Sequence, residues 1–318
     1  MDDLRIRLAA DPVSVPGARR FVTDALRAWS RTDVLDDAEL CVSELAGNAA
    51  LHSASTFMVV SLHRSERTVR VSVEDDGLTP ALAVHPRMGF PGPDEQIPPH
   101  DIDAESTTGR GLAIVSILAR DWGVEETDIG KRVWADLAGD DDEHPVRPPS
   151  GAVSTRSAAQ GALPPGWTLV RLVACPVELS LQQDRHLDEL VRELQLMSGD
   201  VASARSQALA ERLEGILSGG AHARHTGRME AMLAADAGLE DIDVEMAMPN
   251  ELARSVRDLQ EAVSAADALC EEARLLTLAS PPEVRALRRW MTEEITAQVA
   301  GAEPVPWPEW RRRHDLPR

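Results

Sequence analysis

The chain has 318 residues, and its 33 Lys and Arg against 53 Asp and Glu give a net charge of −20. This acidic balance disfavours direct binding to nucleic-acid phosphates or to anionic lipid. No apolar run approaches the ~20 residues of a membrane-spanning helix, and the three cysteines lie too far apart for a metal clip or a disulfide framework. At roughly 150 residues per domain, the length predicts two domains. The scattered cysteines favour a reducing compartment, so we expect the protein in the cytoplasm.

The first part of the chain predicts a layered α+β domain over residues 1–138. Apolar residues recur with helical periodicity in 18–29 and again in 34–51. Two β-rich runs follow at 56–62 and 68–74, separated by a short polar segment. This pattern predicts two helices followed by a pair of strands.

A long loop interrupts this domain. Residues 78–108 contain six prolines and no sustained periodicity, and loops of such length are usually functional lids or disordered. After the loop, 110–122 reads as a helix with a buried face, and 123–137 reads as two further strands. The expected class is therefore α+β with a lid between the third helix and the strands before it.

The second part of the chain begins after an expected linker. Residues 139–165 are acidic and then rich in Pro, Gly, Ser and Ala, the composition of a flexible, unpacked segment. Apolar stripes then predict a mostly helical regulatory or interaction domain over 166–301. Two β-like runs in it, 168–175 and 242–248, either pair with each other or cap the helices. The tail 302–318 is either disordered or docked through its tryptophans.

The second expected helix carries polar side chains on one face. Glu44, Asn48 and His52 are spaced four residues apart, which places them one above the other along the helix. Downstream, Asp75 ends a β-run, and Gly77 follows where the backbone turns or lets a ligand approach. A carboxylate and an amide that converge in this way suit the binding of a polar ligand.

Paired glycines precede the third expected helix in the run Thr107-Thr108-Gly109-Arg110-Gly111. Glycines at a helix N-terminus leave backbone N–H groups free to face an anion, and the helix dipole adds to the attraction. Phosphate is the ligand that this arrangement favours.

The order and spacing of these motifs resemble the GHKL superfamily of ATPases and kinases. The greatest similarity is to its RsbW-like branch of anti-sigma-factor serine-protein kinases, and it covers residues from about 10 to 138. The resemblance implies a GHKL (Bergerat) two-layer α/β sandwich that binds ATP and Mg²⁺, with 78–108 as the ATP lid.

The resemblance also implies roles for single residues. Glu44, Asn48 and His52 match the N box, in which the Glu is the general base and the Asn oxygen coordinates Mg²⁺. Asp75 and Gly77 match the D-x-G box, in which the Asp accepts a hydrogen bond from the adenine amino group.

The glycine run corresponds to the G-x-G box of the family. Gly109, Arg110 and Gly111 would then cover the phosphates of ATP. These roles agree with what phosphoryl transfer needs, namely a carboxylate base, a neutral oxygen ligand for a hard cation and backbone donors for phosphate.

Three further residues need separate interpretation, and one of them, Arg132, departs from the family. The family often has a Gly-Lys-Thr-Val-Trp-like run whose Thr faces the adenine, and here Arg132 replaces that hydroxyl. Lys131 beside it either meets a phosphate or, as is usual for a lysine at a strand turn, is solvated. His186 is on the wrong side of the domain for a phosphoacceptor, and we expect it on a helix surface.

Two functions follow from these observations. The first is an ATP-dependent serine/threonine protein kinase that phosphorylates a STAS-type antagonist and regulates a sigma factor by partner switching. The alternative is a non-catalytic ATP-binding module, sequestering or sensory, whose helical domain binds a protein partner. Both functions are compatible with a homodimer, and neither involves direct contact with nucleic acid or membrane.

Overall fold

We describe the protein from a computed structural model. The described residues are 3–65, 67–77, 107–139, 161–196 and 204–315. The chain divides into two compact units, Met1–Pro165 and Gly166–Arg318. Among the described residues, none of the helices combines the length and the apolar composition that a bilayer crossing requires.

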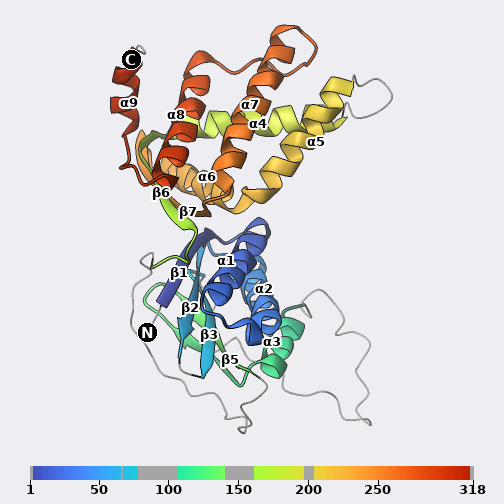
Figure 1. Cartoon of the computed structure of the whole chain (residues 1–318), viewed down its shortest axis with the longest axis vertical. Helices are drawn as coiled ribbons and strands as arrows, with labels where there is room; N and C mark the ends of the chain where they lie inside the picture. Colours follow the sequence, from blue (N-terminus) through green and yellow to red (C-terminus); the bar gives the residue numbers. More distant parts are fainter. Residues whose placement is uncertain (1–2, 66, 78–106, 140–160, 197–203, 316–318) are drawn as a thin grey trace. The chain divides into compact units, whose positions relative to one another are not determined.

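The first unit is an antiparallel sheet with helices packed on it. In chain order its elements are β1 (Asp3–Ala9), the 3₁₀ helix η1 (Pro12–Ser14), α1 (Val15–Ala28), the 3₁₀ helix η2 (Thr32–Val34), α2 (Leu35–His52), β2 (Phe57–Arg64), β3 (Thr68–Asp75), α3 (Thr107–Leu118), β4 (Asp121–Glu126) and β5 (Lys131–Ala138). The described strands pair in the order β1-β2-β3-β5-β4. Helices α1 and α2 pack on each other, α2 lies on β2, β3 and β5, and α3 contacts α2 and β4 (Figure 1).

The sheet buries one face because its apolar residues share a register. Ile6, Val60, Val73 and Val133 lie side by side on β1, β2, β3 and β5, and all four are buried. Successive side chains of a strand point to opposite faces, so polar residues between these positions lie on the other face. The two-layer α/β sandwich predicted from the sequence is confirmed.

Strand β1 is absent from the expected elements. Its buried residues Leu4, Ile6 and Leu8 alternate with polar ones, and Ala9 at its end is buried as well. The N–H of Arg5 donates to the carbonyl of Ala162 at 3.0 Å. The last residues of the expected linker, 161–165, therefore lie beside β1, whereas 140–160 lie outside the described residues.

The third helix begins and ends earlier than expected over 110–122. Helix α3 starts at Thr107, and it ends at Leu118 because the next residues join the sheet: the Arg120 N–H donates to the Asp136 carbonyl at 2.8 Å. Trp122 already belongs to β4. Most of the expected lid, 78–106, lies outside the described residues.

The second unit is mostly helical and contains one described pair of strands. Its elements are β6 (Trp167–Pro176), α4 (Val177–Leu196), α5 (Ala204–Gly219), α6 (Ala221–Asp236), β7 (Asp241–Pro249), α7 (Leu252–Glu271), α8 (Pro282–Val299) and α9 (Trp307–Arg313). Strands β6 and β7 pair antiparallel, which is the first of the two alternatives for the β-like runs. The mostly helical character predicted for this part is confirmed.

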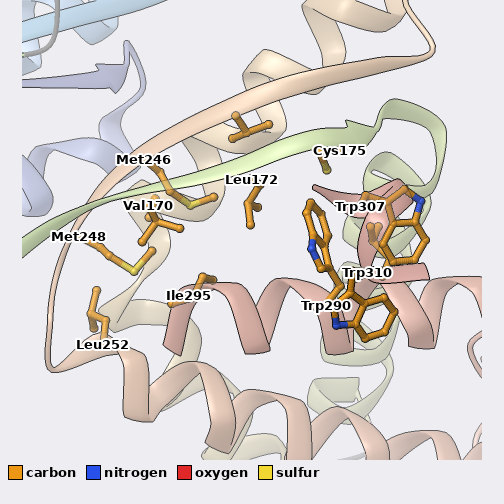
Figure 2. Close-up of a cluster of buried hydrophobic side chains, with 13 residues drawn as sticks. Val170, Leu172, Cys175, Met246, Met248, Leu252, Trp290, Ile295, Trp307 and Trp310 are labelled. Carbon is orange, nitrogen blue, oxygen red and sulfur yellow. The ribbon is translucent and has the colours of Figure 1, made fainter. Parts of the chain in front are cut away.

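The tail docks into the core of the second unit. Trp307 and Trp310 are buried beside Trp290 of α8, with ring centroids 5.5 Å apart for both Trp290–Trp307 and Trp307–Trp310 (Figure 2). The indole N–H of Trp290 donates to the carbonyl of Val305 at 2.9 Å. Of the two alternatives for 302–318, the docked tail is the one found.

His186 is buried, and the expectation of a helix-surface histidine is wrong. Its Nε2 lies 3.2 Å from Oδ1 of Asp267. This contact joins α4 to α7. Burial by itself would raise the pKa of Asp267, but hydrogen bonds from His186 and Ser280 lower that pKa to about 2. The periodicity of α4 alone did not distinguish this inward position from a solvated one.

Candidate functional site

Helix α2 presents the first two residues of the E-x-x-x-N-x-x-x-H motif. Glu44 and Asn48 are half-buried and lie one turn apart. Burial raises the pKa of the neighbouring Cys41 thiol to about 12, and the carboxylates of Asp37 and Glu44 contribute to that rise. Cys41 is therefore a neutral core residue. His52 ends α2, and its side chain lies outside the described atoms.

Helix α3 approaches α2 closely because Gly111 has no side chain. A Cβ built at Gly111 would lie 2.5 Å from Oε2 of Glu44 and 3.5 Å from Nδ2 of Asn48. The structure thus brings the second glycine of the G-x-G box directly against the two polar residues of α2. Gly109 and Arg110 belong to the first turn of α3, where backbone N–H groups have no partner within the helix. The side chain of Arg110 lies outside the described atoms.

Asp75 ends β3 as a buried, highly connected carboxylate. It is 3% exposed, and its Oδ1 accepts from Nζ of Lys131 at 2.9 Å, Oγ of Ser55 at 3.1 Å and the N–H of Gly77 at 3.0 Å. All three donors reach Oδ1, so Oδ2 is the oxygen available to a ligand.

The end of β3 and the end of α2 touch at Gly77. A Cβ at Gly77 would collide with the carbonyl oxygen of Ser53, and a Cβ at Gly130 would collide with that of Asp75. Ala54, the residue after Ser53, has a φ of +52°, a left-handed conformation that a residue with a side chain rarely adopts. The tight turn after α2 and the two glycines together place Asp75 next to the helix.

Arg132 does not face the same side as Asp75, which corrects the expectation from the family run. Asp75 pairs with Lys131 in the sheet register, whereas Arg132 pairs with Glu74 on the opposite face. Nη2 of Arg132 donates to Oε2 of Glu74 at 2.6 Å, and Nη1 lies 3.6 Å from Oε2 of Glu125. The side chain of Arg132 therefore does not lie on the face of the sheet that carries Asp75.

Two residues of the site were missed by the sequence reasoning. Lys131 is 7% exposed and paired with Asp75, so the expectation of a solvated lysine is wrong. A signal existed, because Lys131 is the single lysine of the chain. Ser55 reaches Asp75 only through the turn after α2, and no local pattern announces that contact.

The chemical groups at this site suit ATP. The close approach at Gly111 places the backbone N–H groups at the start of α3 beside the carboxylate of Glu44 and the amide of Asn48. The carboxylate of Asp75 offers a further oxygen. Within the described residues, no group of three His, Cys, Asp or Glu side chains is placed to hold a metal ion. A Mg²⁺ ion bound with ATP takes most of its ligands from phosphates and water, and the oxygen of Asn48 would be available to hold it.

Comparison with known proteins gives a similarity that lies in the first unit. Residues 8–137, which run from β1 to β5, match the family model of the histidine kinase-like ATPase domain. No curated protein matches the chain. The first unit is therefore similar to histidine kinase-like ATPase domains.

Proposed function

We propose that the chain is an ATP-dependent serine/threonine protein kinase of the anti-sigma-factor type. The observation that carries this proposal is the close approach of Gly111 to Glu44 and Asn48, which brings a carboxylate, an amide and the start of α3 together. A kinase needs little covalent chemistry from the protein, because positioning and charge stabilisation supply most of the catalysis.

Each site residue has a distinct role in this proposal. Glu44 accepts the proton of the substrate hydroxyl as the γ-phosphoryl group transfers, and Asn48 binds the cation. Bound Mg²⁺ supplies charge neutralisation for the phosphates. Oδ2 of Asp75 accepts the adenine amino group, with Lys131 and Ser55 holding the other oxygen. Gly109, Arg110 and Gly111 contribute the start of α3 to the phosphates, because helix N-termini attract anions.

The proposed substrate is a serine or threonine on a small STAS-type antagonist. Phosphorylation of that antagonist would regulate a sigma factor by partner switching. The net charge of −20 disfavours direct contact with DNA and is complementary to a basic protein surface. A role in transcription would therefore act through proteins.

The test combines nucleotide binding with phosphoryl transfer. Full-length protein is titrated with Mg-ATP by calorimetry, and transfer from γ-labelled ATP to candidate STAS-type antagonists is measured. Glu44→Gln should bind ATP as the wild type does and transfer phosphate ~10²- to 10⁴-fold more slowly, because a general base is lost. The matched control is Asp36→Asn, an exposed acid in the first turn of the same helix, and it should transfer normally.

The possible results separate kinase from binding module. Unchanged transfer by Glu44→Gln would remove Glu44 as the base. Tight ATP binding without transfer to any candidate, together with co-purification of a sigma factor, would favour a non-catalytic sequestering module. Absence of ATP binding would overturn both.

A further inference from the structure

The second unit contains a cavity of about 180 Å³ among β6, β7 and helices α4 to α8. Its wall is mostly apolar and includes Met246, Met248, Leu252 and Ile295, which belong to the core drawn in Figure 2. A cavity of roughly 150 Å³ with such a lining accommodates a benzene molecule. The volume therefore suits a single ring with a small substituent. Methionine side chains in the wall would let it adapt to the shape of the ring.

Four buried polar atoms on residues of this wall lack a hydrogen-bond partner among the described residues, and one of them, Oδ2 of Asp184, lies 3.0 Å from Nη1 of Arg228 in an ion pair. The three that remain are Oε1 of Gln183, Oε1 of Gln260 and Nε of Arg288. Buried polar groups in folded proteins are nearly always paired, because an unpaired one loses its bonds to water without compensation. A ligand that donates to the glutamine oxygens and accepts from Nε of Arg288 would satisfy all three.

Arg288 is held rigidly and its charge is already compensated. Its Nη1 donates to Oδ2 of Asp267 at 3.4 Å, and its Nη2 donates to Oγ of Ser280 at 2.5 Å. Asp267 is itself fixed by His186 at 3.2 Å and by the N–H of Ser280 at 2.7 Å. Nε is the nitrogen of Arg288 that has no acceptor among the described residues. Because the charge of the guanidinium already faces Asp267, a neutral acceptor such as a carbonyl oxygen suits this N–H better than a second carboxylate.

We propose that this cavity is a binding site for a small, neutral, single-ring compound that carries both a carbonyl acceptor and an N–H or O–H donor. The ring fills the apolar part of the cavity, and the substituent meets the three unpaired atoms. All residues that line the site belong to the second unit.

Benzamide is a suitable probe because it combines a ring, a carbonyl oxygen and an NH₂ donor. The chain has nine methionines, and three of them, Met246, Met248 and Met291, line the cavity. In the full chain labelled with ¹³C-methyl methionine, benzamide should shift these three methyl signals saturably. The signal of Met58, a core residue of the first unit, should stay unchanged.

The polar part of the proposal is tested by Gln260→Met, an unbranched replacement of similar length. It should weaken benzamide binding about tenfold, the size of one lost hydrogen bond, and leave the binding of toluene, which has no polar group, unchanged. Gln182→Met is the matched control, since Gln182 is on α4 and does not line the cavity. Equal loss of both ligands in Gln260→Met would overturn the hydrogen-bond assignment.

The location is tested by filling the cavity from Gly227 of α6. A Cβ there would lie 3.5 Å from Cγ1 of Val244, an ordinary contact, so Gly227→Ala should fold and bind benzamide. Gly227→Leu places a larger side chain in the cavity and should abolish binding. Benzamide that causes no saturable shift in the wild type, or that binds Gly227→Leu as well as the wild type, would overturn the proposal.

Discussion

Buried charges are paired in different ways in the two units. In the first unit the partners lie on adjacent strands: Lys131 with Asp75, and Arg132 with Glu74. In the second unit Asp267 gathers groups from separate helices, His186 from α4 and Arg288 from α8. Sheet register decides the first set and helix packing decides the second. The second set should therefore be more sensitive to the loss of one member, because no ladder of backbone hydrogen bonds holds its partners in place.

The largest effect on stability is expected for Asp267→Ala. It leaves Arg288, which is 6% exposed, without its carboxylate, and the loss of one partner of a buried ion pair costs about 3–5 kcal/mol. Urea unfolding of the full chain, followed by tryptophan fluorescence, measures it. Asp258→Ala on the same helix is the control: Asp258 is exposed and should change stability by less than about 0.5 kcal/mol. Similar losses in both variants would contradict the importance of the network.

Gly77→Ala should cost about 3 kcal/mol in the first unit and weaken ATP binding. Its Cβ would collide with the Ser53 backbone, which has no flexible end that could move away. Gly47→Ala on α2 is a matched control, because a Cβ there would meet nothing within 4 Å. That variant should gain about 0.5–1 kcal/mol from helix propensity. A Gly77→Ala protein of wild-type stability would show that the close approach of α2 and β3 is not required.

Comparing Lys131→Met with Arg132→Met sharpens the difference between the two faces of the sheet. Each variant leaves a buried carboxylate without its cation and should cost about 1–3 kcal/mol. Lys131→Met alone should weaken ATP binding, because Lys131 contacts Asp75 whereas Arg132 contacts Glu74. Calorimetry with Mg-ATP distinguishes them, and an equal loss of affinity in Arg132→Met would place Arg132 back at the nucleotide.

The smallest effect is an acid dependence of the second unit. The pKa of Asp267 falls from its ordinary value of 3.8 to about 2 in the folded chain. Its carboxylate therefore stabilises the fold fully above about pH 5, by about 2 kcal/mol in total, and this contribution is lost as the pH falls toward 2. About 1 kcal/mol of the loss is expected between pH 5 and pH 3. Unfolding curves at pH 5, 4 and 3 measure it. Asp267→Asn should flatten that dependence, and an unchanged slope would contradict the assignment.

Local patterns predicted much of the first unit. The helices at 18–29 and 34–51 and the strands at 56–62 and 68–74 agree with α1, α2, β2 and β3 to within a few residues. Their periodicities are strong because each element buries one face. β1 was missed although its large apolar residues alternate, since a seven-residue strand gives only three such positions, Leu4, Ile6 and Leu8.

The candidate site was predicted in part. Glu44, Asn48 and Gly111 stand in motifs whose spacing already places them on the same helix or at a helix start, and they meet in the structure. Lys131 was misjudged because a strand end permits a side chain to point to either face. Only its pairing with Asp75 in the sheet decides which face it takes.

The sequence by itself determined the class of the fold, the order of most of its elements and the motifs that resemble those of ATPase domains, because these depend on periodicity and spacing along the chain. The tertiary structure alone decided the partners of the buried charges, the docking of the tail and the cavity in the second unit. His186 and Asp267 are 81 residues apart, and Gln298 bonds Arg171 of β6 across 127 residues. Contacts at such separations leave no local periodicity, since they arise only when helices pack against one another.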